Sequence, residues 1–403
     1  MKKTMGLAAL AVLLLSGTAS AQQVNVKIGV LTDMSSLYAD DTGIGSVIGA
    51  KLAAEDFMKT NPKFKVEVVS ADHQNKADNG VNIANQWYDR DGVDAIADVP
   101  NSGVALAIAE VTKTKNKAFL ASGPASSDLT GPKCSPNTIH WTYDTWMLAN
   151  GTGKAMVKTG GDTWFFLTSD YAFGHALERD TAAVVEKTGG KVLGKVRHPI
   201  NTNDFSSFLL QAQASKAKVI GLANAGGDTI NAIKQGAEFG IVAGGQKFAG
   251  MLIFAPDVLA LGLKTAQGLT FTETWYWDLN EGTRAWTKRW DKERNSPGKV
   301  PSMNMAGVYS ATLHYLKAVA AVGSAKDGKA VVDKMKQLPA EDTIYGKSVV
   351  REDGRVLHPA YLFEAKKPDE SKYPGDLYHL RATIPMEEAF RPLKDGNCPL
   401  VKG

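Results

Sequence analysis

Short apolar segments alternate with amphipathic ones along this sequence, and the alternation limits the possible folds more than any other feature. Val24–Thr32 (VNVKIGVLT) is rich in β-branched residues and predicts a strand. Gly43–Lys59 follows with its apolar residues on one side, which is the spacing of a helix. Further strands are expected at Val66–Ala71, Val93–Val99 and Lys117–Ala121, with helices at Asn75–Asp91 and Val104–Thr114. This order predicts an α/β protein with a doubly wound parallel sheet.

The same alternation restarts after a segment at Thr138–Tyr143 and predicts a second lobe of the same type. Its expected helices are Thr145–Lys158, Phe173–Lys187, Phe205–Ser215 and Asp228–Glu238, and its expected strands are Thr163–Ser169, Lys191–Arg197, Val219–Ala223, Phe248–Phe254 and Gly268–Trp275. Two helices and short β segments should follow, at Arg284–Arg294, Met305–Val322, Tyr361–Glu364 and Tyr378–Ala382. A chain of 403 residues also exceeds what one core usually carries, so two lobes are expected.

Residues 1–21 have the pattern of a cleavable signal peptide. Lys2 and Lys3 precede the apolar run Leu7–Leu15, and a small-residue cleavage site ends at Ala21. The apolar run is too short to span a bilayer. Without these residues, 44 basic residues stand against 42 acidic ones, a net charge of about +2 that gives no reason to expect nucleic-acid or membrane binding. We therefore expect an exported protein, with the periplasm as its location.

Cys134 and Cys398 are the only cysteines in the sequence. An isolated pair in an exported protein predicts a structural disulfide, and two separate buried thiols are the alternative. The seven histidines are scattered without the spacing of metal ligands, and the sequence contains neither an HExxH nor a GxSxG motif. We expect no metal, no cofactor and no catalytic residue.

Two loops of small polar residues follow neighbouring strands. Ser122–Ser127 comes directly after Lys117–Ala121, and Pro100–Gly103 follows the preceding strand. Loops at the carboxyl ends of adjacent parallel strands line one crevice, and small residues let a ligand approach the backbone closely. The two loops therefore indicate a site for an anionic or polar head group. They could equally be ordinary turns that cap helices.

Aromatic residues also gather at predicted strand ends. Tyr38 lies in the first loop between strand and helix, Tyr171 and Phe173 follow the strand at 163–169, and Trp275 follows the strand at 268–274. If two lobes face each other, these rings converge on one cleft and suit a ligand with an apolar or aromatic body. Alternatively, some of them cover the lobe cores.

Several segments resemble type I periplasmic binding proteins of branched-chain amino acid uptake systems. They are, in the order of that family, IGVLTDMSSLYADDTGIGSVIGAKLAAEDF, ADHQNKADNGVNIANQW, ASGPASSDLT, FLTSDYAFGHAL and FSSFLLQAQASKAKVIGLANAGGDT. The resemblance implies two Rossmann-like lobes, joined by three crossovers, that close around a small solute and present it to an ABC permease. It places the crossovers near Tyr143–Asp144, Trp275–Asp278 and Lys347–Val356. Residues 22–143 with 278–350 would form lobe 1, and 144–277 with 351–403 lobe 2. A monomeric, non-enzymatic receptor is expected.

The family's binding positions fall on matching residues of this sequence. Tyr38 matches the aromatic of the first loop, and four residues match the two loops that meet a ligand carboxylate: Asn101, Ser102, Ala125 and Ser126. The second-lobe contacts fall on Tyr171, Phe173 and the region of Asn224 and Ala225, and Trp275 is a further candidate.

One family feature is missing. Leucine-type members pair an acidic residue with the α-amino group of the ligand, but that position falls on Met251-Leu252-Ile253 here. An unpaired buried ammonium costs several kcal/mol, and Asp170 is the candidate to replace the missing acid. The sequence therefore favours a carboxylate with an apolar or aromatic body over a zwitterion. Two other functions compete with a transport receptor: a sensor that uses the same cleft, and an exported α/β hydrolase, which is disfavoured because no nucleophile–base pair can be placed.

Overall fold

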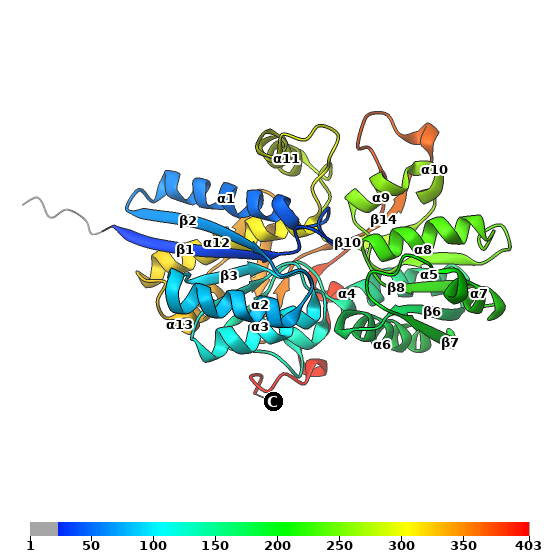
Figure 1. Cartoon of the computed structure of the whole chain (residues 1–403), viewed down its shortest axis with the longest axis horizontal. Coiled ribbons are helices and arrows are strands. Elements are labelled where there is room, and N and C mark those ends of the chain that lie inside the picture. Colours follow the sequence, from blue (N-terminus) through cyan, green and yellow to red (C-terminus); the bar gives the residue numbers. More distant parts are fainter. Residues whose placement is uncertain (1–22, 403) are drawn as a thin grey trace, which may run out of the picture.

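The computed structural model describes residues 23–402 and consists of two α/β halves side by side (Figure 1). The predicted signal peptide lies outside the described residues. As expected, the chain builds two separate parallel sheets, each covered by helices.

The first half contains a five-stranded sheet with the order β2-β1-β3-β4-β5, and every pairing in it is parallel. Its strands are β1 (Val24–Thr32), β2 (Phe64–Asp72), β3 (Ala95–Asp98), β4 (Ala118–Ala121) and β5 (Thr138–His140). Its helices are α1 (Gly43–Thr60), α2 (Ala77–Gln86), α3 (Ser102–Thr114), α11 (Glu281–Arg294), α12 (Met303–Val322) and α13 (Gly328–Gln337).

Alternation along the strands divides the core of this half into two layers. Ala95 and Ala97 of β3 join the apolar cluster beneath α1, α12 and α13, whereas Ile96 between them joins the cluster beneath α2 and α3. Side chains of a strand point alternately to the two faces of its sheet, so a short strand of apolar residues fills both layers. This explains why β3 and β4 are entirely buried.

The second half contains the parallel sheet β7-β6-β8-β9 and a separate antiparallel sheet β10-β14-β15. The parallel strands are β6 (Thr163–Ser169), β7 (Lys191–His198), β8 (Val219–Ala223) and β9 (Lys247–Gly250), and the antiparallel strands are β10 (Thr270–Glu273), β14 (Ala360–Ala365) and β15 (Tyr378–Ile384). The helices are α4 (Thr145–Leu148), α5 (Lys154–Lys158), α6 (Ala172–Lys187), α7 (Ser206–Ala214), α8 (Gly227–Glu238), α9 (Ala255–Leu261), α10 (Leu263–Ala266) and α14 (Met386–Ala389).

The chain passes between the halves three times: between β5 and α4, between β10 and α11, and between β13 and β14. Before the third passage, β11 (Ala340–Asp342), β12 (Gly346–Val350) and β13 (Val356–Leu357) form a small antiparallel sheet. Arg355 forms a parallel bridge with His140, which places this segment beside the five-stranded sheet. The fold class predicted from the sequence is therefore confirmed, whereas the residue boundaries of the lobes stay a prediction.

Several elements differ from the sequence-based expectation. The strand expected at Phe248–Phe254 ends at Gly250, so the last four residues of that range form a loop. The helices expected at Asn75–Asp91 and Thr145–Lys158 contain π-helical turns at Trp87–Asp91 and Ala149–Gly153. Helices α9, α10 and α13 were not predicted, because short helices without a long apolar period give a weak sequence signal.

Cys134 and Cys398 form a disulfide, as predicted, with a Cα–Cα distance of 5.7 Å. It fixes the C-terminal tail to the loop that follows β4. The guanidinium of Arg391 supports the same contact by donating to the carbonyl oxygen of Ser127 at 3.0 Å.

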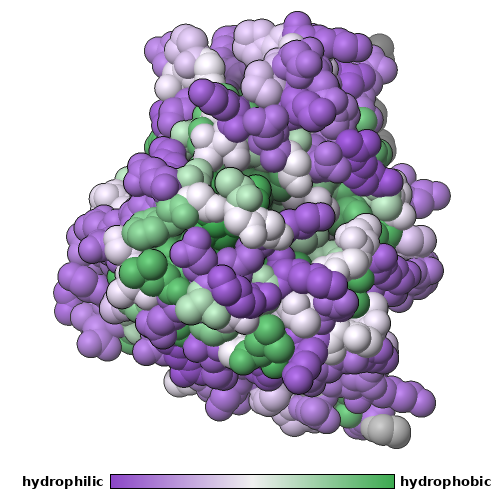
Figure 2. All heavy atoms as spheres, turned by 90° about the vertical axis from the view of Figure 1, so that its right-hand side faces the viewer, coloured by the Kyte–Doolittle hydropathy of each residue, from purple (hydrophilic) through white to green (hydrophobic). Residues whose placement is uncertain are grey.

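The face of the molecule at the end of the second half is mainly hydrophilic (Figure 2). Figure 2, which looks onto the end formed by the second half, shows polar side chains around smaller apolar clusters. Exposed apolar side chains of this half include Leu193, Leu210 and Val242. Among the helices of residues 23–402, none has the length and apolar character needed to cross a membrane.

Candidate ligand-binding site

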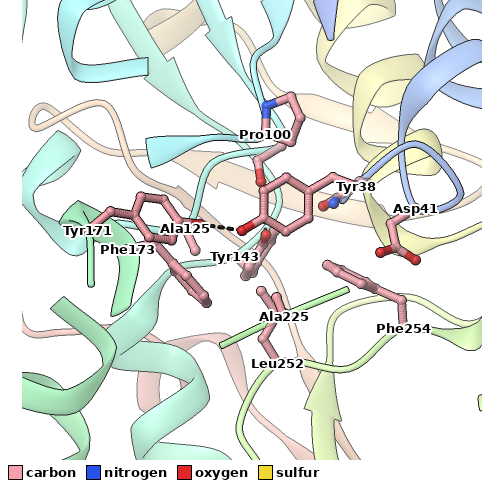
Figure 3. A pocket seen from close by; sticks show the side chains of 12 residues that line it. Tyr38, Asp41, Pro100, Ala125, Tyr143, Tyr171, Phe173, Ala225, Leu252 and Phe254 are labelled. Carbon is pink, nitrogen blue, oxygen red and sulfur yellow. Dashed lines mark hydrogen bonds between the residues drawn. The ribbon is translucent and has the colours of Figure 1, made fainter. Parts of the chain in front are cut away.

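A cavity lies where the two halves meet, at the carboxyl ends of their parallel strands (Figure 3). Twelve residues line it: Tyr38, Asp41, Pro100, Gly123, Ala125, Tyr143, Tyr171, Phe173, Ala225, Leu252, Phe254 and Asn304. Eleven of them follow a strand of one of the two parallel sheets, and Asn304 comes from the first turn of α12. In open α/β sheets, ligands bind at this end of the strands.

The cavity is narrow in this arrangement of the halves. It outlines about 270 Å³ of space free of atoms, part of which is open to solvent, and only about 10 Å³ of it is wide enough for water. That is room for about one water molecule. A larger ligand can enter only if the halves separate or the lining side chains move.

The loop after β1 holds Tyr38 in the cavity wall. The buried carboxylate of Asp33 accepts the backbone N–H of Ser36 at 3.0 Å and that of Tyr38 at 2.9 Å. The amide of Asn75 donates to the same carboxylate at 2.7 Å. These bonds fix the loop, so the ring of Tyr38 is positioned before any ligand arrives.

The two small-residue loops approach each other closely, as predicted. Ser102 Oγ accepts the backbone N–H groups of Ala125 at 3.3 Å and Ser126 at 3.2 Å, and it keeps its own hydrogen for donation. A Cβ on Gly123 would lie 2.5 Å from an oxygen of Asp98, so only glycine permits this approach. Gly123 and Ala125 therefore expose backbone to the cavity.

Two of the predicted head-group residues have capping roles. Asn101 is the N-cap of α3, and its Oδ1 accepts from Gly103 N at 2.9 Å and Val104 N at 3.1 Å. Ser126 caps the short 3₁₀ turn that follows it, since its hydroxyl accepts from Asp128 N at 3.3 Å. Neither residue lines the cavity itself. The two loops therefore combine both interpretations offered by the sequence: they cap helical turns, and they border the cavity.

Aromatic rings from both halves form much of the wall. The hydroxyl groups of Tyr38 and Tyr171 are hydrogen-bonded across the cavity (Figure 3). Tyr171 packs on Phe173 with ring centroids 5.9 Å apart, and Tyr143 meets Phe254 edge-on at 6.2 Å. Burial raises the pKa of Tyr38 and of Tyr171, so both phenols stay protonated at neutral pH and can donate hydrogen bonds.

Besides Asn101, Ser102 and Ser126, three predicted site residues lie away from the cavity lining. Asp170 is about half exposed and bonds His175 Nε2 at 2.7 Å. Asn224 is buried, and its Oδ1 accepts from the hydroxyl of Thr229 at 2.7 Å. Trp275 packs edge-on against Trp286, with ring centroids 5.5 Å apart. Tyr38, Ala125, Tyr171, Phe173 and Ala225 are the predicted residues that the structure brings together at the cavity.

Sequence reasoning did not predict a ligand contact at four lining positions: Asp41, Tyr143, Phe254 and Asn304. Pro100 and Gly123 belong to the two predicted head-group loops, and Leu252 is the position at which the family's acidic residue is missing. Leu252 and Phe254 were placed in a strand, although β9 ends before them. Asp41 follows Tyr38 in the same loop, and this proximity was the available signal. Asn304 is about 260 residues away from that loop in the sequence, so no local pattern connects the two.

Contacts beside the cavity join the two halves. The hydroxyl of Ser127 donates to the carboxylate of Asp180 at 2.6 Å, and Arg179 pairs with Asp128 at 3.1 Å. Gly226, with φ +57°, lies against the loop of Tyr38, where a Cβ would approach Leu37 O to 2.5 Å. The structure is therefore in a closed arrangement. Within residues 23–402, no group of three or more His, Cys, Asp or Glu side chains could hold a metal ion.

The fold and the position of this cavity are those of a two-lobed receptor for a small solute. A family model described as periplasmic binding protein matches residues 25–371. The chain therefore belongs to the periplasmic binding protein family. It is a solute receptor of ABC transport, as the sequence predicted.

Three similar proteins illustrate this relationship. A periplasmic binding protein from Burkholderia mallei is 49% identical with a TM-score of 0.90, covering 95% of this chain and 100% of its own. A branched-chain amino acid ABC transporter periplasmic ligand-binding protein from Burkholderia xenovorans is 40% identical with a TM-score of 0.82, covering 93% and 99%. The Leu/Ile/Val-binding protein homolog 6 of Brucella melitensis is 25% identical over 92% of this chain and 95% of its own length. None of the three is described as a hydrolase or a sensor.

Proposed function

We infer that the cavity binds a small amino-acid-like or carboxylate solute, which the protein delivers in the periplasm to a membrane ABC permease. The observation that carries this inference is the closed, aromatic-lined cavity formed by residues of both halves at the carboxyl ends of their strands. Such a cavity removes most of the surface of a small ligand from water. The Burkholderia xenovorans relative, at 40% identity, supports the permease and the amino-acid-like class.

The polar and apolar walls have separate roles in this proposal. The carboxylate of the ligand would lie against the loops that follow β3 and β4, where the hydroxyl of Ser102, behind the lining residue Ala125, has a hydrogen left to donate. Asn101 and Ser126 hold the two loops in place through their capping bonds. Tyr171 and Phe173 on one side, with Leu252 and Phe254 on another, enclose the apolar body. Hydrogen bonds to a carboxylate are about twice as strong as those between neutral groups, so they fix its orientation.

Filling the cavity should abolish binding. Ala225 is buried in the wall, and Ala225→Leu adds three carbon atoms at that position. We expect that the variant folds but shows no rise in melting temperature with a solute that stabilises the parent protein, because a bound ligand stabilises only the state that binds it. A thermal-shift screen of amino acids, aromatic acids and small amides identifies that solute. Ala214→Leu, on the exposed end of α7, is the control and should respond like the parent. An equal response of both variants would place the ligand elsewhere.

Ligand binding should also change the overall shape. The hydrogen bond between Tyr38 and Tyr171 crosses the cavity and is available only when the halves are closed. A ligand between the halves adds contacts to the closed form and shifts the equilibrium towards it. Solution scattering should give a larger radius of gyration without ligand than with it, and the liganded value should match this structure. An identical profile in both states would contradict hinge closure.

A further inference from the structure

Asp41 places a carboxylate with an unused acceptor in the cavity wall. Its side chain is 1% exposed, and across residues 23–402 its Oδ1 has no hydrogen-bond partner. In Figure 3 the carboxylate lies beside Tyr38 and Phe254, on the side of the cavity opposite Tyr171 and Phe173. A buried carboxylate oxygen without a donor is unfavourable, so a group that supplies one would be bound strongly.

The backbone holds Asp41 firmly at this position. Its N–H donates to Tyr38 O at 3.1 Å, and its carbonyl oxygen accepts from Ser302 Oγ at 2.5 Å. Ser302 is the N-cap of α12, and its hydroxyl also accepts from the backbone N–H of Asn304 at 3.2 Å. The loop after β1 and the start of α12 are therefore tied together, and the backbone of Asp41 is held beside the cavity.

The surroundings of Asp41 contain more acidic than basic groups. Asp257 of α9, Glu273 of β10 and Asp40 of the same loop face it, and Lys299, which precedes α12, is the basic group near it. Lys299 binds Asp40 at 3.0 Å on the surface. None of the twelve described lining residues is Lys, Arg or His, so the wall provides no positive charge for the carboxylate of Asp41.

A second unsatisfied acceptor lies in the same wall. Asn304 is 2% exposed, and its Oδ1 likewise has no partner in the described part of the chain. An ammonium group has three hydrogens to donate and no acceptor of its own. One carboxylate and one amide oxygen, both buried and unpartnered, are a suitable set of acceptors for it.

We propose that Asp41 is the partner of a positively charged nitrogen, so that the cavity selects a small amine-bearing solute over the corresponding acid without the amine. This proposal rests on the proposed function and specifies its ligand. The sequence favoured a ligand without an amine, because Leu252 stands where leucine-type members have an acidic residue. In this proposal Asp41, from the first half of the chain, supplies the acid instead. Asp170 is then not needed as a substitute.

The protonation of Asp41 gives the proposal a second observable. Burial, with the nearby charges of Asp257, Asp40 and Glu273, raises the pKa of Asp41 well above its ordinary value, while Lys299 lowers it. Tyr143 is a further titratable group near it, and its own pKa is raised by burial. A cationic ligand stabilises the ionised carboxylate, so its binding should release a proton, and its affinity should increase as the pH rises through the raised pKa of Asp41.

The test uses three probes of one shape: leucine, 4-methylpentanoate, which lacks the amine, and 3-methylbutylamine, which lacks the carboxylate. Calorimetry would measure their affinities for the parent protein, for Asp41→Asn and for the control Asp40→Asn. Asp40 carries the same charge one residue away, but its side chain is 70% exposed. We expect leucine to bind the parent more tightly than 4-methylpentanoate does, and Asp41→Asn to weaken leucine roughly tenfold or more, since one charge partner is lost. Asp40→Asn should lower the affinity for leucine much less than Asp41→Asn does, because the carboxylate of Asp40 is exposed and does not line the cavity.

The outcomes separate the two proposals. Tighter binding of 4-methylpentanoate than of leucine, or equal leucine affinity in Asp41→Asn and the parent, would overturn the role of Asp41 and leave the solute-binding proposal intact. If none of the probes binds the parent, the amino-acid-like class falls, and the role of Asp41 with it. Measurements in two buffers with different ionisation enthalpies should show proton release with leucine in the parent and less of it in Asp41→Asn. Unchanged release in the variant would also count against Asp41.

Discussion

Arg355→Met should lower the free energy of unfolding by about 3–5 kcal/mol, because it breaks a fully buried charge network. Arg355 has 0% exposure, and its guanidinium donates to Tyr143 O at 2.7 Å, to Val356 O at 3.0 Å and to Trp141 O. Asp144 lies 3.6 Å from it. Methionine fills similar space but leaves these carbonyl groups and the carboxylate without a donor.

Denaturant unfolding of the parent and the variant, followed by circular dichroism, measures this loss. Burial lowers the pKa of Arg355 to about 10, so the side chain is still charged at neutral pH and the network is intact under the conditions of the experiment. Arg284→Met is the matched control, since Arg284 is 46% exposed and pairs with Asp278 at the surface. Its effect should stay within about 1 kcal/mol. Similar losses of unfolding free energy in both variants would show that the buried network of Arg355 contributes no more to stability than a surface ion pair.

Removing the disulfide is the second change with a large expected effect. Cys134 and Cys398 are 264 residues apart, so the bond closes a long loop in the unfolded chain. In the chain-entropy model, a loop of this length is worth up to about 5 kcal/mol. The double variant Cys134→Ser, Cys398→Ser should unfold at a clearly lower denaturant concentration than the oxidised parent. The parent unfolded in a reductant is the control and should show the same loss. A midpoint that does not change would mean that the reduced, unfolded chain already keeps the two ends close.

The fold could be predicted from the sequence because most elements carry their own pattern. Val24–Thr32 and Thr163–Ser169 have the predicted bounds, since apolar strands between polar turns are clear local signals. Helix α13 was not predicted. The strand predicted at 248–254 is too long, because Leu252 and Phe254 are apolar without belonging to a strand. They face the cavity rather than a sheet.

The site was harder to predict than the fold. Tyr38, Tyr171 and Phe173 were found because aromatic residues at strand ends stand out in a sequence. Asp41 was missed because an acid in a polar loop is expected to be solvated, and its burial depends on α9 and α12, which are remote in the chain. Local patterns show which residues are unusual, but long-range packing decides which of them lose contact with water.

The order in which the chain is synthesised affects the two halves differently. The sheet β7-β6-β8-β9 uses only residues between 163 and 250, so all its strands are available soon after one another. Helix α1, in contrast, packs on α12, which begins more than 240 residues after α1 ends. Until α12 has been made, Gly45 and Gly49 of α1, which lie against Met305, have no partner to cover them. Domains generally fold as units during synthesis. The half that contains the start of the chain therefore keeps part of its core open while the parallel sheet of the other half is already complete, and this apolar surface is one that a chaperone would have to protect in the meantime.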